Sequence, residues 1–204
     1  AEKLVPVERD GLPVVEKEFS FPLGTIAFPA GQILDEPAEI EVWWNGIIDG
    51  LIYYQNDLWI VDHKTTSVMG EKFADDKLRS SQMLGYTYVG RHFEEKLGKV
   101  VRGVLINALA IRKNDFEFRH YPLPIAAWKV QEWQTETLHA IKQLVRSFVD
   151  FLNTSEAVPI REHCVTKYGK CKYFEVCESV PSIRYRSLFD SGLFKENTWA
   201  PGSE

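Results

Sequence analysis

Two neighbouring stretches, GIIDG at residues 46–50 and LWIVDHKTTS at residues 58–67, place ionisable side chains within apolar runs. Asp49 lies in the first stretch, and Asp62 and Lys64 follow the apolar start of the second. Charged side chains are rarely buried unless they are paired or bind a metal ion. Both stretches are predicted as strands, because the intervening QND is typical of a tight polar turn. We therefore expect an antiparallel hairpin that carries the three charged groups.

The segments on either side of this hairpin predict an α/β fold. Alternating apolar and polar residues predict strands over 14–21 and 38–44, so that residues 38–64 form a meander. Helical spacing predicts a helix over residues 80–97, with a serine cap at its start and Gly98 at its end. Further elements are expected on the C-terminal side: a buried strand over 100–111, a strand in DFEFRHYPL at 115–123, and a long amphipathic helix from Pro124 to about Asn153. The order predicts a mixed central sheet flanked by helices.

The composition is that of a globular protein with a substantial core. Of 204 residues, 45% are hydrophobic and 26% are charged, and no apolar run approaches the roughly 20 residues that a membrane-spanning helix needs. We predict a core domain over residues 1–153 and a loop-rich segment over 154–204. The net charge of −5 argues against a protein that coats polyanions, but it leaves room for a local carboxylate site. The chain begins with Ala1 rather than Met, so it is processed, trimmed or, as we expect, a piece of a longer protein, and no basic, apolar leader marks it for secretion.

The spacing of the charged residues favours a metal site. Residues two apart in a strand point to the same face, so Asp62 and Lys64 should project together and His63 away from them. If Asp49 lies alongside, two carboxylates would repel each other, and a hard cation such as Mg²⁺ would remove that conflict. The backbone carbonyl of His63 could supply a further oxygen. Lys64 would then help the attacking water in phosphodiester hydrolysis; the alternative is a structural Asp–Lys pair beside a turn aspartate.

The helix that follows carries two further candidates. Gln82 and Tyr86 are four residues apart and therefore share one face of the helix over residues 80–97. That face could turn towards the acidic cluster, where an amide and a phenol could contact nucleic acid. The alternative is an ordinary helix surface, since this spacing is common.

Three motifs in chain order resemble those of a known family. Gly46-x-x-Asp49, Asp62-x-Lys64 and Gln82-x-x-x-Tyr86 resemble the RecB-like branch of the PD-(D/E)XK nuclease superfamily, and VDHKTTS followed by SQMLGY is close to how that branch is written. Similar domains occur in phage and CRISPR-adaptation nucleases. The resemblance is strong over residues 40–90 and extends in outline to residue 153. It implies a restriction-endonuclease-like fold of phage or bacterial origin.

The resemblance also implies a role for each residue. Asp49 and Asp62 would bind the catalytic Mg²⁺ or Mn²⁺, and Lys64 would assist the attacking water. Gln82 and Tyr86 would complete the site and contact DNA. Members of the branch often carry a further acid or histidine on a helix before the first strand, and that helix is absent from this sequence. Acids near the first strands could substitute for it: Glu16, Glu18, Glu39 or Glu41.

The three cysteines are close together in the C-terminal segment. Cys164, Cys171 and Cys177 could ligate zinc or an iron–sulfur cluster, although either centre normally has four protein ligands. His163 could be a fourth zinc ligand. The spacing resembles the cysteine trio of iron–sulfur nucleases in the same branch, which implies a [4Fe–4S] cluster whose fourth ligand is not in this chain. The alternatives are a zinc ion, or thiols that only pack in the segment.

The resemblance favours a metal-dependent deoxyribonuclease, acting as an exonuclease at single-stranded DNA ends in recombination, repair or phage DNA processing. A helicase or recombination protein would be its partner, and a membrane would not. Two other hypotheses remain open: a scaffold domain that binds nucleic acid without cutting it, and a site-specific endonuclease. The expected location is the cytoplasm of a bacterial or phage-infected cell.

Overall fold

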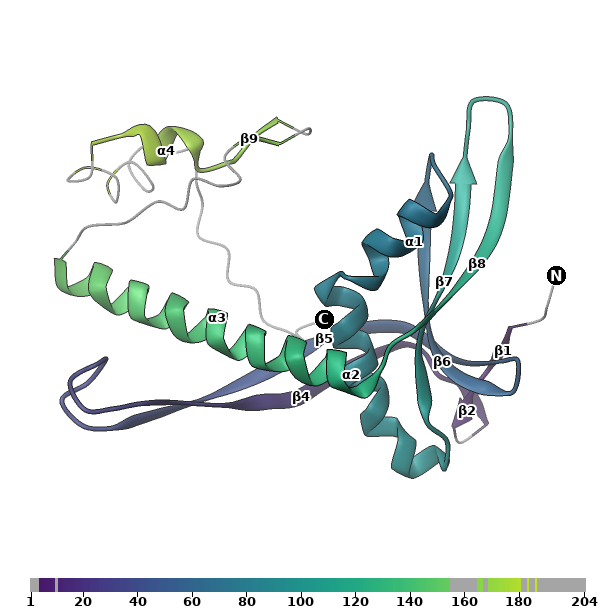
Figure 1. Cartoon of the computed structure of the whole chain (residues 1–204), viewed down its shortest axis with the longest axis horizontal. Coiled ribbons are helices and arrows are strands. Elements are labelled where there is room, and N and C mark those ends of the chain that lie inside the picture. Colours follow the sequence, from purple (N-terminus) through teal and green to yellow (C-terminus); the bar gives the residue numbers. More distant parts are fainter. Residues whose placement is uncertain are drawn as a thin grey trace. The chain divides into compact units, whose positions relative to one another are not determined.

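The structure is a computed structural model, which describes residues 4–9, 11–154, 165–166, 169–180, 183 and 186 (Figure 1). The long strands are β4 (Val15–Phe28), β5 (Ala38–Tyr54), β6 (Asp57–Thr66), β7 (Val101–Ile111) and β8 (Phe116–Pro124). The helices are α1 (Glu71–Leu78), α2 (Ser81–Leu97), α3 (Ala127–Thr154) and α4 (Phe174–Glu178). Short strands are β1 (Val5–Pro6), β2 (Glu8–Arg9), β3 (Leu12–Pro13), β9 (Val165–Thr166) and β10 (Gly169–Lys170).

The chain divides into two compact units. The first comprises residues 1–26 and 40–138, and the second comprises residues 27–39 and 139–204. Within the described part of the second unit, the end of β4 is fastened to the second half of α3: Lys142 Nζ donates to the Ala27 carbonyl at 2.7 Å, and Arg146 donates to the Gln32 side chain at 2.7 Å. The helices α1 and α2 and the sheet, apart from the end of β4 and the start of β5, belong to the first unit.

The central sheet is mixed, as expected. Its described strands follow the order β1-β5-β6-β7-β8, and β4 also pairs with β5. The strands β6 and β7 are parallel and are joined through α1 and α2, whereas the other pairings along this path are antiparallel. This arrangement confirms the predicted α/β class with a mixed sheet flanked by helices.

Local sequence signals explain how the central elements begin and end. Gln55 and Asn56, with φ values of 50° and 65°, form the two-residue turn between β5 and β6, since left-handed turns match the twist of paired strands. The Ser80 hydroxyl accepts from Met83 N at the start of α2, and Gly98 ends that helix in the left-handed conformation. The predicted hairpin and helix are both present.

The helices α1 and α2 pack against one face of the sheet (Figure 1). The core on that face joins Met83 and Val89 of α2 to apolar residues of β6 and β7, including Ile60, Val104 and Ile106. The opposite face has a smaller cluster of Ile52, Trp59, Val61 and Leu105. The first half of β6 is covered on both faces, which explains why residues 58–61 are all apolar before Asp62.

Two predicted element boundaries were wrong. Residues 38–44 and 46–54 form the single strand β5, which continues through Gly46. A Cβ at Gly46 would lie 2.9 Å from the Phe19 ring. The glycine therefore allows the ring to pack against the strand, and it does not interrupt the strand. Pro124 ends β8 opposite Gly103 and does not open a helix; α3 begins at Ala127. The structure also adds α1, which was not predicted.

Candidate active site

The β5–β6 hairpin brings Asp49 to Asp62. The last registered pair at this end is Gly50 with Val61, so one further antiparallel step sets Asp49 opposite Asp62. Asp49 Oδ2 accepts a hydrogen bond from the backbone N–H of His63 at 2.7 Å. The carboxylate of β5 is thereby fixed against the backbone of β6, between the two residues that carry the other charges.

Asp62 is a buried carboxylate with one unsatisfied oxygen. Its side chain is only 1% exposed, and Lys64 Nζ donates to Oδ1 at 2.8 Å. Oδ2 is buried and has no hydrogen-bond partner. Burial raises the pKa of Asp62 and the nearby Asp49 charge raises it further, while the bond and charge of Lys64 oppose the shift without cancelling it. The site therefore holds a carboxylate whose charge the protein alone does not fully compensate.

The helix α2 adds Gln82 and Tyr86 to this cluster. Gln82 Nε2 donates to the Tyr86 hydroxyl at 3.1 Å, and that hydroxyl donates to the Ile47 carbonyl of β5 at 3.1 Å. Burial is the largest cause of the raised pKa of Tyr86; the hydrogen bond from Gln82 lowers it, the Asp62 and Asp49 charges raise it, and the Lys64 charge lowers it. The phenol therefore lies within electrostatic range of all three charged residues, and it stays protonated at neutral pH.

His63 turns its ring to the other side of the sheet. Its Nδ1 lies 3.0 Å from Asn107 Nδ2, and Asn107 is its register partner on β7. The structure thus brings together the side chains of the five predicted catalytic residues Asp49, Asp62, Lys64, Gln82 and Tyr86, and excludes the His63 ring from the cluster. Metal ligation by the His63 carbonyl stays a prediction.

In a comparison with protein-family models, residues 6–178 match the model of the PD-(D/E)XK nuclease superfamily. The chain belongs to the PD-(D/E)XK nuclease superfamily. A search of curated proteins finds no match. Membership in the superfamily implies a metal-dependent nuclease with a nucleic-acid substrate, and superfamily members usually use Mg²⁺ or Mn²⁺.

The residues of this superfamily member fit such a cation. Mg²⁺ takes oxygen ligands and is commonly held by one or two carboxylates together with waters and phosphate oxygens. Asp62 Oδ2 is an oxygen without a partner, and Asp49 lies close enough to raise the pKa of Asp62. A divalent ion between them would supply the missing partner and remove the repulsion. Among the described residues, no three His, Cys, Asp or Glu side chains form a metal-binding group, and Asp49 and Asp62 are the two carboxylates at this position.

Sequence reasoning missed Lys77, whose charge also lowers the pKa of Asp62. Lys77 lies in the last turn of α1, and its ammonium lies 5.8 Å from the centre of the Phe73 ring. The signal was present but weak: Glu71 in the first turn and Lys77 in the last turn suit the dipole of a short helix. An eight-residue helix offers too few apolar positions for its period to be recognised.

The cysteine prediction falls partly outside the described residues. Cys164 lies there, while Cys171 and Cys177 are described as partly exposed free thiols. The described residues support neither a zinc site nor an iron–sulfur site. Within the same described part of the chain, no helix is long and apolar enough to cross a membrane.

Proposed function

We propose that this chain is a Mg²⁺- or Mn²⁺-dependent deoxyribonuclease, in which Asp49 and Asp62 hold the metal ion and the His63 carbonyl completes the protein ligands. The observation that carries the proposal is the buried, unpartnered Oδ2 of Asp62 beside a second carboxylate. A protein does not usually keep such a group unless a ligand or a reaction uses it. Membership in the superfamily supplies the reaction class.

A cation held by Asp49 and Asp62 would supply Lewis acidity towards the scissile phosphate and would lower the pKa of a water. Lys64 keeps its hydrogen bond to Asp62, and this bond holds the Lys64 ammonium beside the metal position. There the ammonium orients the attacking water and balances the negative charge of the phosphate. Tyr86 remains protonated, and its one O–H, which donates to the Ile47 carbonyl without substrate, can turn to donate to a phosphate oxygen instead. Gln82 holds the phenol in place through its side-chain amide.

We further propose that the enzyme acts as an exonuclease at single-stranded ends, together with a helicase or a recombination protein. The support is the resemblance of the three motifs to the RecB-like branch, which also favours recombination, repair or phage DNA processing in the cytoplasm of a bacterial or phage-infected cell. Residues 1–153 would form the nuclease core, and residues 154–204 would form an accessory segment.

The test is a cleavage assay on four DNA substrates: linear and circular, each single- and double-stranded. With Mg²⁺ or Mn²⁺, the wild-type chain should degrade linear DNA that has single-stranded ends and leave closed circles intact. Asp62→Asn should be inactive on every substrate, and Asp57→Asn, at the opposite end of β6, is a matched control that should retain activity. Discrete fragments from a circle would replace the exonuclease proposal with a site-specific endonuclease.

One observation favours a second candidate, a domain that binds nucleic acid without cutting it. Among the described residues the acidic cluster holds two carboxylates rather than a group of three. If catalysis needs a third acidic ligand and none is supplied, the chain should bind DNA in a salt-dependent manner and show no cleavage even in Mn²⁺. Cleavage that depends on Asp62 would exclude this candidate.

For the cysteines we propose a [4Fe–4S] cluster on Cys164, Cys171 and Cys177, with a fourth ligand from outside this chain. The support is the resemblance of their spacing to that of iron–sulfur nucleases. Anaerobically purified protein should then show visible absorbance that Cys171→Ala removes. Colourless protein with bound zinc would favour the zinc alternative, and protein without either metal would leave the thiols a packing role.

A further inference from the structure

The outer edge of β8 is open, and its hydrogen-bonding pattern can be assigned. Ile125 N donates to the Arg102 carbonyl at 2.9 Å, and at the other end Arg112 N donates to the Asp115 carbonyl at 2.8 Å. In an antiparallel ladder, bonded pairs alternate with non-bonded pairs. The odd-numbered residues of β8 therefore bond to β7, and its even-numbered residues turn their N–H and C=O groups outward.

Two prolines support this assignment and limit the open edge. Pro122 and Pro124 occupy even-numbered positions, where a missing N–H costs the ladder nothing. They also cannot donate to a further strand. The residues whose outward N–H groups remain available are Phe116, Phe118 and His120. Among the described residues, no strand pairs with this edge.

The same short stretch exposes large apolar side chains. Phe116 and Phe118 are 68% and 63% exposed, and their ring centres are 5.9 Å apart. Ile111, the register partner of Phe116 on β7, is 58% exposed. Natural edge strands usually do not combine unpaired main-chain groups with exposed aromatic rings. An exposed apolar patch of this kind marks an interaction site, so we expect another strand to bind this edge.

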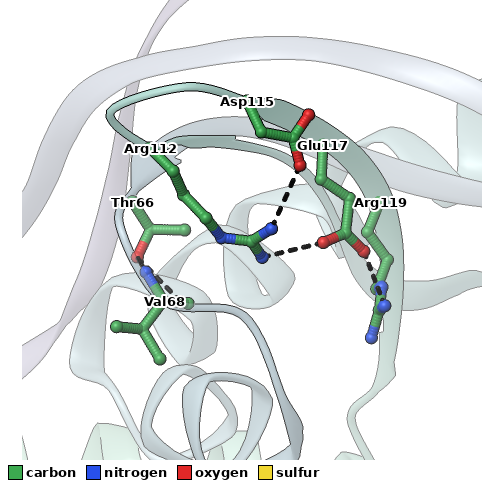
Figure 2. A network of polar contacts seen from close by, with 6 residues as sticks. All are labelled: Thr66, Val68, Arg112, Asp115, Glu117 and Arg119. Atoms are coloured by element: carbon green, nitrogen blue, oxygen red, sulfur yellow. Dashed lines mark hydrogen bonds and ion pairs between the residues drawn. The ribbon is translucent and has the colours of Figure 1, made fainter.

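Charged side chains alternate with these rings and occupy the other face. Glu117 accepts from Arg119 at 2.6 Å and from Arg112 at 2.9 Å, as Figure 2 shows. Glu117 and Arg119 are two residues apart and therefore lie on the same face of β8. Their opposite charges determine which charges a neighbouring strand must carry at the facing positions. Like charges directly opposite each other across a strand pair are destabilising, and opposite charges are favourable.

This charge pattern is complementary to itself in one antiparallel register. Two β8 edges related by a two-fold axis at Phe118 set each Glu117 opposite Arg119 of the partner subunit. Moving the axis to Glu117 would set two glutamates opposite each other, and moving it to Arg119 would do the same with two arginines. With the axis at Phe118, outward-facing residues meet outward-facing residues, as a bonded pair requires.

We propose that two copies of this chain associate through β8, antiparallel and centred on Phe118, and so form one continuous sheet. Phe118 pairs with Phe118 of the partner subunit, and each Phe116 pairs with His120 of the partner subunit. The contact is isologous, because the same surface serves both copies, and the prolines end it beyond His120. A peptide strand from an unrelated protein would have no reason to match this charge order.

The test is the mass of the 204-residue chain in solution, measured by sedimentation velocity. The wild type should sediment as a dimer, at about twice the 23.5 kDa of one chain. Glu117→Arg and Arg119→Glu should each be monomeric, since each puts like charges opposite each other at both positions. An equimolar mixture of the two variants should form a heterodimer, because all the opposed charges are then complementary.

Two further variants keep the result interpretable. Arg112→Ala removes one intrachain bond to Glu117 but lies outside the paired stretch, so it should remain dimeric. Phe118→Pro removes an outward N–H and a ring at a position equivalent to those of Pro122 and Pro124. It should therefore keep a folded circular-dichroism spectrum and become monomeric, which tests the edge without altering its charges. A monomeric wild type, or a mixture of charge variants that stays monomeric while both are folded, would overturn the proposal.

Discussion

The buried carboxylate of Asp62 should make the metal-free protein less stable as the pH rises. Burial raises the pKa of this carboxyl, and the bond from Lys64 opposes that shift only in part. The folded protein therefore binds a proton more tightly than the unfolded chain. The stability that this proton contributes is fully present below the ordinary carboxyl pKa near 4, and it is lost as the pH rises through the raised pKa of the folded state.

The size of the effect follows from the unsatisfied oxygen. A buried polar group without a partner costs about 1–3 kcal/mol. Asp62 Oδ1 keeps its bond to Lys64 and only Oδ2 lacks a partner, so the lower end of that range, about 1 kcal/mol, is expected. For a chain of this size, this corresponds to about 2–4 °C in melting temperature.

The assay compares wild type and Asp62→Asn by calorimetry in EDTA from pH 4 to pH 7. The asparagine does not titrate, so the melting temperature of wild type relative to the variant should fall by about 2–4 °C over that range. Mg²⁺ at pH 7 should then raise the melting temperature of wild type and not that of the variant. A difference that does not change with pH, or an equal Mg²⁺ effect on both proteins, would refute the reasoning.

Three other substitutions have distinct expected outcomes. Gly103→Ala should destabilise the fold by more than about 4 kcal/mol in a denaturant titration, because φ is +152° and a Cβ would lie 2.1 Å from the Leu123 carbonyl oxygen; a loss below about 1 kcal/mol would contradict the β7–β8 packing. Gly85→Ala should cost about 1–3 kcal/mol in the same assay, since its Cβ would lie 2.7 Å from the Trp44 ring; an unchanged denaturation midpoint would contradict this close packing. Tyr86→Phe should lower kcat for DNA cleavage by about tenfold or more with little change in melting temperature, and unchanged kcat would remove the phenol from the reaction.

The parts of the fold that the sequence predicts are those with strong local signals. The β5–β6 hairpin has left-handed turn residues between apolar runs, and α2 has a serine cap and a terminal glycine. Where the structure departs from expectation, tertiary contacts decide. Gly46 continues a strand because the Phe19 ring fills its space, and Pro124 fits β8 because its position faces outward from the ladder.

The candidate site shows the same division. The two-residue period of a strand predicts that Asp62 and Lys64 share a face, and the structure joins them by a 2.8 Å bond. The bond from His63 N to Asp49 depends on the register of the hairpin, which the sequence indicates only in outline. Lys77 reaches Asp62 from a different helix, and no spacing along the chain could reveal that proximity.

The central claim is that the residues around Asp49 and Asp62 carry out metal-dependent hydrolysis with Lys64. Its most direct test is the rate of Mg²⁺-dependent DNA cleavage by Lys64→Ala. The matched control is Lys99→Ala, whose ammonium bonds to Asn56 O in the turn at the other end of β6. We predict a loss of about 100-fold or more for Lys64→Ala, with a circular-dichroism spectrum that remains folded, and wild-type rates for Lys99→Ala. Equal rates for the two folded variants would contradict the account.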